Sequence, residues 1–467
     1  MSKKTKPAWA QQGHAKPVSR RDFLAAGLLP FAANIFIPNW VSLLVGTNAE
    51  GATPTCPVPG SLIPFVTVNL AGGAAMASNW VPMNSAGEPL SSYNTMGLGD
   101  NQLPIEKEFG NATFAGGGIS KILAGIRQTA TTTTIAKTTF IGIPVESTSD
   151  SSFNSFDISG AVTKAGLIGT ALGNLGSFAT NTGIRQLSAL MAPPSPLVVT
   201  TYQDIVNSVS YTASIGSRLS KNQKLSLVKL MNNLTASQAK KIADVSGGPA
   251  VESVLDCAGI KNVSTMSLSS DIFSPISNAG VAKIWGVTTA TAVNAPEKTF
   301  SSMIYCSLMG YAGTCNLELG GYDYHDNTRT TGDDKDLEAG NLLGRIIESA
   351  AVLGKPVMIY VVSDGAVFSP TSSDRSAPWS GDQSGTGAAY LLYFNPNGRP
   401  AVSGNQIGYF TNNQVSDVST LTGGSPRNTG IAVLANYLQA NKRIDLFNSL
   451  AGGLIDSTQL NSILRIA

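Results

Sequence analysis

The clearest pattern of apolar and polar positions lies in the second half of the chain. Leu317–Leu319 alternates with polar residues and predicts a short strand, which ends at Gly320. Apolar residues then recur at helical spacing over Leu337–Leu353, and Gly354 follows where helices commonly end. Val357–Val362 is an unbroken apolar run, typical of a strand buried on both faces of a parallel sheet. The pattern therefore predicts a β-α-β unit with a right-handed crossover.

Similar patterns predict further elements along the chain. Strands are predicted over Phe65–Leu70, Thr138–Ile143 and Ala388–Phe394, with a short edge strand over Gln406–Thr411. Helices are predicted over Ile119–Thr129, Phe156–Ala165, Ser220–Leu234, Thr235–Val245, Lys298–Met309 and Asn428–Ala440, with a last helical piece near Leu460. Strands and helices that alternate in this way predict an α/β fold with a largely parallel sheet flanked by helices.

Changes of composition divide the chain into five parts. Residues 1–49 are a predicted export signal and residues 50–64 are a linker rich in Pro, Gly and Thr. Residues 65–169 and 298–467 form the first and second parts of the predicted α/β core. Residues 170–297 carry weaker strand patterns and are predicted to be a mainly helical insertion.

The first part has the features of a twin-arginine export signal. Ser19–Leu24 reads Ser-Arg-Arg-Asp-Phe-Leu, a basic region precedes it, and the apolar stretch Leu24–Val45 follows. Proline and asparagine interrupt that stretch, so no lasting membrane span is expected, and cleavage is predicted after Ala49. The alternative is an uncleaved membrane anchor. The pattern predicts export by the twin-arginine machinery across a bacterial inner membrane, to the periplasm or the cell surface.

The composition gives little information about what the protein binds. Charged residues make up 13% of the chain, against roughly a quarter in an average soluble protein, and the formal net charge is +2. The first 49 residues hold six basic side chains against one acidic, and the rest of the sequence has no basic patch that would indicate nucleic-acid binding.

The four cysteines allow three disulfide connectivities in an oxidising compartment. They are Cys56, Cys257, Cys306 and Cys315. Cys306 and Cys315 are close in sequence, so a disulfide between these two is the favoured prediction. The alternative is that all four are small buried thiols.

The side chains that could bind a metal ion or act in catalysis follow the ends of the predicted strands. His325 is the one histidine after the signal, which excludes a site of three histidines for zinc, and no nucleophile elbow or phosphate-binding loop occurs. Asp323, His325 and Asp364 are expected at one edge of the sheet and offer ligands for Mg²⁺, Ca²⁺ or Mn²⁺, with Asp333 and Asp334 in neighbouring loops. The alternative is that these side chains cap a helix or fix a turn.

Several of these motifs together resemble a known family. The twin-arginine start, Gly-Gly-Tyr-Asp-Tyr-His at 320–325 and Val-Ser-Asp-Gly at 362–365 are similar to the exported bacterial family called domain of unknown function 1501. The resemblance runs with gaps from Ser19 to about Arg443. It implies an alkaline phosphatase- and sulfatase-like fold with metal ligands at the strand ends.

The chain departs from the motifs of that family at several ligand positions. Ala74-Ala75 stands where the family has a carboxylate after the first strand, and Ser151-Ser152-Phe153 stands in place of a Ser-His-Phe motif. Asp364 replaces a glutamate, and Asp374-Arg375 lacks the histidine of an Arg-Asp-His motif, so Asp323 and His325 remain unchanged.

Two functions are compatible with these departures. The favoured one is a non-catalytic envelope protein that keeps the fold for binding or assembly, with a degenerate metal site. The alternative is a metal-dependent hydrolase of phosphate or sulfate esters, in which Ser151 or Ser152 would act as the nucleophile near Asp364.

Overall fold

The computed structural model describes residues 62–100, 104–146, 158–177, 196–209, 220–239, 270–322, 329–363, 365–369, 379–382 and 384–467. The chain divides into two units, Met1–Cys56 with Leu219–Ser267, and Pro57–Arg218 with Leu268–Ala467. The described part of the first unit is Ser220 and helix α8 (Lys221–Ala239). The predicted helix start at Thr235 is wrong, because α8 continues through that residue.

A seven-stranded sheet forms the centre of the second unit. Its order is β6 (Thr138–Pro144), β13 (Ala388–Phe394), β10 (Val357–Ser363), β1 (Phe65–Leu70), β9 (Cys315–Leu319), β7 (Leu175–Gly176) and β8 (Leu197–Val198). The two neighbours of β13 pair with it antiparallel, and every other pair in the sheet is parallel. The predicted α/β fold with a largely parallel sheet is therefore confirmed. Strands β7 and β8 fall within the segment that was predicted to be mainly helical.

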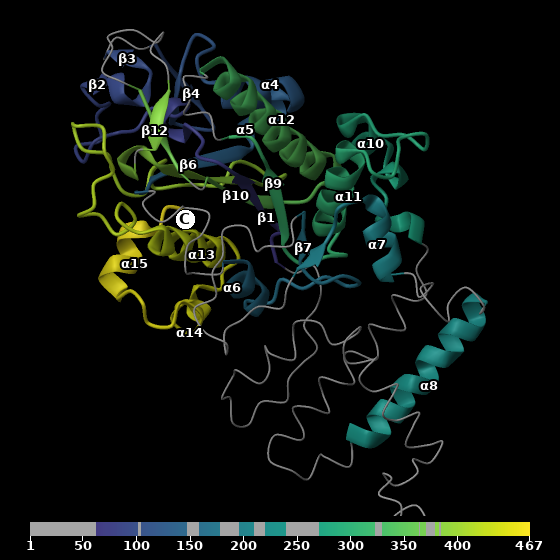
Figure 1. Ribbon diagram of the computed structural model, residues 1–467. Helices are drawn as coiled ribbons and strands as arrows, with labels where there is room; N and C mark the ends of the chain where they lie inside the picture. The colour runs from purple at the N-terminus through teal and green to yellow at the C-terminus, as the bar shows by residue number, and fades with distance from the viewer. Residues whose placement is uncertain are drawn as a thin grey trace, which may run out of the picture. The chain divides into compact units, whose positions relative to one another are not determined.

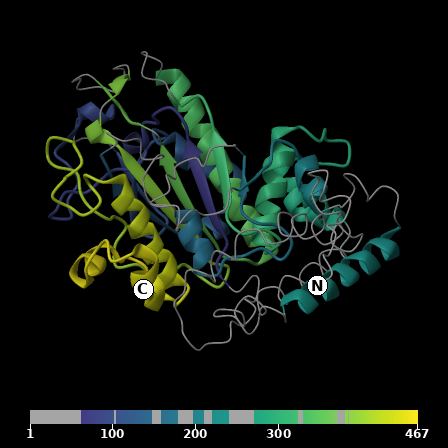
Figure 2. The same cartoon turned by 60° about the horizontal axis from the view of Figure 1, so that its bottom comes forward.

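Helices cover both faces of this sheet. The helices of the second unit are α4 (Lys121–Thr129), α5 (Thr132–Ala136), α6 (Ile158–Lys164), α7 (Tyr202–Val209), α10 (Ala279–Trp285), α11 (Pro296–Leu308), α12 (Arg329–Leu353), α13 (Pro426–Ala440), α14 (Phe447–Ala451) and α15 (Ser457–Ile463). Figures 1 and 2 show α12 and α4 on one face and α13 and α6 on the other. Each face buries its own apolar cluster, so the sheet is the middle of three layers.

Shorter elements lie around the sheet. Three small two-stranded antiparallel sheets pair β2 (Ser92–Tyr93) with β3 (Gly99–Asp100), β4 (Ile105–Glu108) with β5 (Ala112–Ala115), and β11 (Val367–Phe368) with β12 (Ser380–Asp382). Short 3₁₀ turns are η1 (Met76–Ser78), η2 (Asn94–Met96), η4 (Ser270–Phe273), η5 (Pro275–Ser277), η6 (Ser384–Thr386) and η7 (Ile444–Leu446).

Strands β9 and β10 are joined by α12, as the apolar pattern predicts, but they are not neighbours in the sheet. Strand β1 lies between them and is parallel to both. Helix α12 begins at Arg329, before the predicted start at Leu337. Among the helices in the described part of the chain, none is long and apolar enough to cross a membrane.

The predicted edge strand over Gln406–Thr411 is wrong. The segment makes single bridges to Gly142 and Ser416 instead of a ladder. Gly408 has a φ of 75°, which breaks the extended backbone, and the Gln406 side chain bonds both backbone groups of Met83.

Helices α4 and α12 approach so closely that glycine is required at their contact. A Cβ on Gly340 would lie 2.9 Å from the Cα of Ile122, and a Cβ on Gly344 would lie 2.8 Å from the carbonyl oxygen of Ile126. A hydrogen bond of 3.1 Å from Thr129 Oγ1 to the Asn341 carbonyl oxygen joins the same two helices. Backbone therefore packs against backbone, which fixes the position of α4 on α12.

We expect Gly340→Ala to lower the free energy of unfolding by about 1–3 kcal/mol, because the helices must separate to admit the methyl group. The higher helix propensity of alanine offsets this loss only in part. Asp334→Ala, on the exposed side of α12, is the matched control and should change stability by no more than about 0.5 kcal/mol. Urea unfolding measures both variants, and equal stability for the two would contradict this packing.

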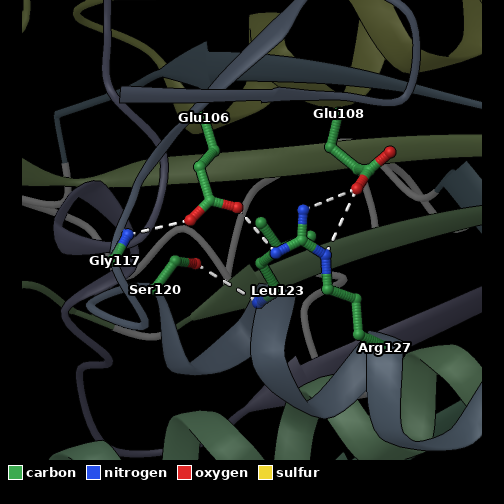
Figure 3. A network of polar contacts seen from close by, with 6 residues as sticks. All are labelled: Glu106, Glu108, Gly117, Ser120, Leu123 and Arg127. Atoms are coloured by element: carbon green, nitrogen blue, oxygen red, sulfur yellow. Dashed lines mark hydrogen bonds and ion pairs between the residues drawn. The ribbon is translucent and has the colours of Figure 1, made fainter. Parts of the chain in front are cut away.

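The β4–β5 hairpin is joined to α4 by an ion-pair network (Figure 3). Arg127 donates to Glu106 Oε2 over 2.6 Å and to Glu108 Oε2 over 2.7 Å. The other oxygen of Glu106 accepts from the Gly117 backbone N–H, and the Ser120 hydroxyl caps α4 by accepting from Leu123 N–H. The network is partly exposed, so its contribution to stability is small.

We expect Arg127→Met to lower stability at neutral pH by about 0.2–1 kcal/mol for each ion pair lost. Hydrogen bonding to Arg127 holds the pKa of Glu106 below its ordinary value. The stability that the ion pair of Glu106 contributes is fully present above the ordinary pKa of glutamate. It is lost as the pH falls through the lowered pKa of Glu106.

Chemical unfolding at neutral pH and below the ordinary pKa of glutamate measures this effect. The difference between wild type and Arg127→Met should shrink on acidification and in high salt. Lys107→Met removes the same charge from an exposed position of β4 and should show neither trend. A difference for Arg127→Met that is independent of pH would argue against the ion pairs.

Candidate functional site

The strand ends that lead to the predicted ligands lie together at one edge of the sheet. Leu70, the last residue of β1, pairs with Leu319 at the end of β9 and with Ser363 at the end of β10. Neighbouring strands are about 4.8 Å apart, so the ends of β9 and β10 are separated by roughly 10 Å, with β1 between them. Asp364 follows β10 directly, and Asp323 is the fourth residue after the end of β9.

The predicted site residues themselves lie outside the described residues. This holds for the three predicted metal ligands and for both predicted nucleophiles: Asp323, His325, Asp364, Ser151 and Ser152. The geometry of the site is therefore given by the described backbone and side chains at the same edge.

The turn after β1 is held tightly against the end of β10. Ala74 N–H donates to Ser363 Oγ over 2.7 Å, and the Ser363 hydroxyl donates to the Leu70 carbonyl oxygen over 2.8 Å. Gly73 has a φ of 102°, and a Cβ on Gly365 would lie 3.1 Å from the Cα of Gly73. The two turns therefore touch through their backbones.

Small apolar side chains occupy this turn. Ala74 is 2% exposed and Ala75 is 4% exposed, so both methyl groups are buried in the apolar core. The Tyr390 hydroxyl donates to the carbonyl oxygen of Met76, the residue after Ala75, and holds that residue in place. Position 75 is thus a buried methyl group, and it offers no ligand to a cation.

A buried carboxylate that the sequence analysis missed lies beside this turn. Asp336 on α12 is 3% exposed, and its Oδ2 accepts from Asn79 Nδ2 over 2.6 Å. Asn79 Oδ1 accepts from Ile122 N–H over 3.1 Å and from the Ser120 hydroxyl over 3.3 Å. The pair joins α12 to the start of α4, which is a structural role. The one sequence signal is the helical spacing of Asp336 from the buried residues Gly340 and Leu343.

Other acidic side chains near the edge are placed differently from the prediction. Asp333 and Asp334 belong to the first turns of α12 and not to a loop. Burial raises the pKa of Asp333. Burial, with a smaller contribution from the Asp336 carboxylate, raises the pKa of Tyr390, so this phenol stays neutral. Among the described residues, no group of three His, Cys, Asp or Glu side chains is arranged to hold a metal ion.

The favoured disulfide is not formed in this structure. Cys306 and Cys315 are both free and fully buried, and Cys306 Sγ donates to the Phe273 carbonyl oxygen over 3.5 Å. Burial raises the pKa of both thiols, so they stay protonated and unreactive. The alternative of small buried thiols describes this pair, while Cys56 and Cys257 lie outside the described residues.

Comparison with known proteins gives no family for the chain. No family model matches it, and a search of the curated proteins found no match.

We expect Ser363→Ala to lower the free energy of unfolding by about 1–3 kcal/mol, because the Ala74 N–H loses its buried acceptor. Ser462→Ala is the control, since the exposed Ser462 hydroxyl donates to the Gln459 carbonyl oxygen within a helix. It should cost less than about 0.5 kcal/mol. Thermal and urea unfolding compare the two, and a neutral Ser363→Ala would show that the edge is not held by this hydroxyl.

Proposed function

We propose that the protein is an exported bacterial envelope protein with an alkaline phosphatase- and sulfatase-like fold, whose metal site is degenerate and whose role is binding and not catalysis. The observation that supports this most directly is the turn after β1. Ala74 and Ala75 are buried there, and the Ser363 hydroxyl holds the turn in place. A two-metal mechanism needs a set of ligands from several strand ends, and this strand end supplies none.

The resemblance to domain of unknown function 1501 supports the fold and the export route in this proposal. The seven-stranded, mostly parallel sheet is compatible with that fold. The arginine pair at Arg20-Arg21 supports export by the twin-arginine machinery to the periplasm or the cell surface.

One observation favours the alternative, a metal-dependent hydrolase of phosphate or sulfate esters. The ends of β9, β1 and β10 are in register, so the segments with Asp323, His325 and Asp364 leave the sheet at one edge. In parallel sheets this edge is the usual position of a ligand site. Ser151 or Ser152 would then be the nucleophile, and Mg²⁺, Ca²⁺ or Mn²⁺ the cofactor.

Assays of the purified mature protein separate the two functions. Aryl phosphates and aryl sulfates are offered with Mg²⁺, Mn²⁺ or Ca²⁺, and we expect no turnover above that of the double variant His325→Ala/Asp364→Asn. Elemental analysis should find far less than one equivalent of any divalent metal, and a chelator should leave the melting temperature unchanged.

The hydrolase makes the opposite predictions. It would release product in a metal-dependent way, and each of the substitutions His325→Ala and Asp364→Asn would remove most of that activity without unfolding the protein. Either single variant with wild-type turnover would mean that the activity belongs to another site or to a contaminant.

A further inference from the structure

The turn that follows β13 consists of Asn395, Pro396, Asn397 and Gly398. It is closed by a hydrogen bond of 3.1 Å from the Gly398 N–H to the Asn395 carbonyl oxygen. Asn395 Oδ1 also accepts from the Asn397 N–H over 3.0 Å. Gly398 has a φ of 142°, a backbone conformation that favours glycine. The turn therefore places a glycine directly after an asparagine.

The amide side chain of Asn397 is free to move at this turn. Asn397 is exposed, and in the part of the chain that the structure describes no hydrogen bond holds its side chain. The space around the next residue is open as well, because a Cβ built on Gly398 would meet no atom within 4 Å. Nothing in this surrounding obstructs contact between the Asn397 side-chain carbonyl carbon and the Gly398 backbone nitrogen.

Other asparagines of the chain lack this combination. The dipeptide Asn-Gly occurs once in the sequence, at 397–398. Asn461 is also exposed, but it lies within α15 and is followed by Ser462, whose side chain shields the backbone nitrogen. Asn436 is fully buried, and its amide is held by bonds to the carbonyl oxygens of Ala432 and Ile463.

We propose that Asn397 is a site of spontaneous deamidation. The Gly398 nitrogen loses its proton to water and attacks Cγ of Asn397, the bond from Cγ to Nδ2 breaks, and ammonia leaves with a proton taken from water. Water then adds to either carbonyl carbon of the resulting succinimide ring and opens it. The products are aspartate and isoaspartate at position 397, each with one new negative charge.

The modified position is separate from the predicted ligand site and independent of the proposed function. Phe394 pairs with Val357 at the start of β10, so the turn lies at the opposite edge of the sheet from Ser363. Lys137 Nζ donates to the Pro396 carbonyl oxygen over 2.8 Å. The new carboxylate therefore forms one residue away from a bound ammonium group, which favours the negative charge.

Mass spectrometry of the purified mature protein tests the proposal. The protein is incubated in mildly alkaline buffer and digested at intervals, and fragmentation that distinguishes aspartate from isoaspartate follows residue 397. We expect progressive conversion to both products, a matching acidic form on ion exchange, and one heavy oxygen atom per product when the water is isotopically labelled. The rate in the folded protein should lie within about tenfold of the rate in urea, because an exposed turn opens at little cost.

Two controls accompany this measurement. Asn461, followed in the same digests, should keep its amide over the time in which Asn397 is converted. Asn397→Gln keeps an exposed amide but requires a larger ring for the same attack, so the acidic form should be absent from this variant after the same incubation.

Several results would overturn the proposal. One is an Asn397 that stays intact in the folded protein while the urea-unfolded chain is converted, since the hydrogen bond that closes the turn would then block the attack. Conversion of Asn397 no faster than that of Asn461, or an undiminished acidic form in Asn397→Gln, would place the reaction elsewhere. Aspartate without any isoaspartate would indicate direct hydrolysis and not the cyclic route.

Discussion

The pairing of β1 on both of its sides is the constraint on which the rest of the structure depends. All six residues of β1 are buried, so their backbone groups have no water and must bond to β9 and β10. Because successive side chains alternate between faces, a slip by one residue would exchange Val66 and Val68 for Thr67 and Asn69. The register is therefore fixed by polarity as well as by hydrogen bonds.

This register also decides what the edge of the sheet can do. It brings Leu70, Leu319 and Ser363 to the same level. The segment that follows β9 and the segment that follows β10 therefore leave the sheet with only the width of β1 between them. The short turn after β1 packs the backbone of Gly73 against Gly365, and its Ala74 and Ala75 side chains are buried in the apolar core. An active metal site at this edge would need ligands from β9 and β10 without any from the central strand.

The sequence predicted the parts of this fold that have strong periodicity. Val357–Val362 is long and wholly apolar, and it is buried on both faces as expected. Strands β7 and β8 have two residues each, too few for any pattern to indicate them. The early start of α12 was missed because its first turns are polar, although Asp336 is buried there by its bond to Asn79. Such a tertiary contact is not visible in local sequence.

Of the candidate site, the sequence indicated the ends of β9 and β10, while Asp323, His325 and Asp364 lie outside the described residues. The buried polar positions of β1 were predictable to a smaller extent. A strand that reads Val-Thr-Val-Asn is normally interpreted as half-buried, with its polar residues in water. Here α12 and α6 lie on opposite faces of the sheet, so Thr67 and Asn69 are buried and do not face solvent, and the Asn69 amide nitrogen bonds Glu318. Sequence alone shows that the two faces differ. Only the three-layer arrangement shows that both are covered, which leaves Thr67 Oγ1 and Asn69 Oδ1 buried without a hydrogen-bond partner among the described residues.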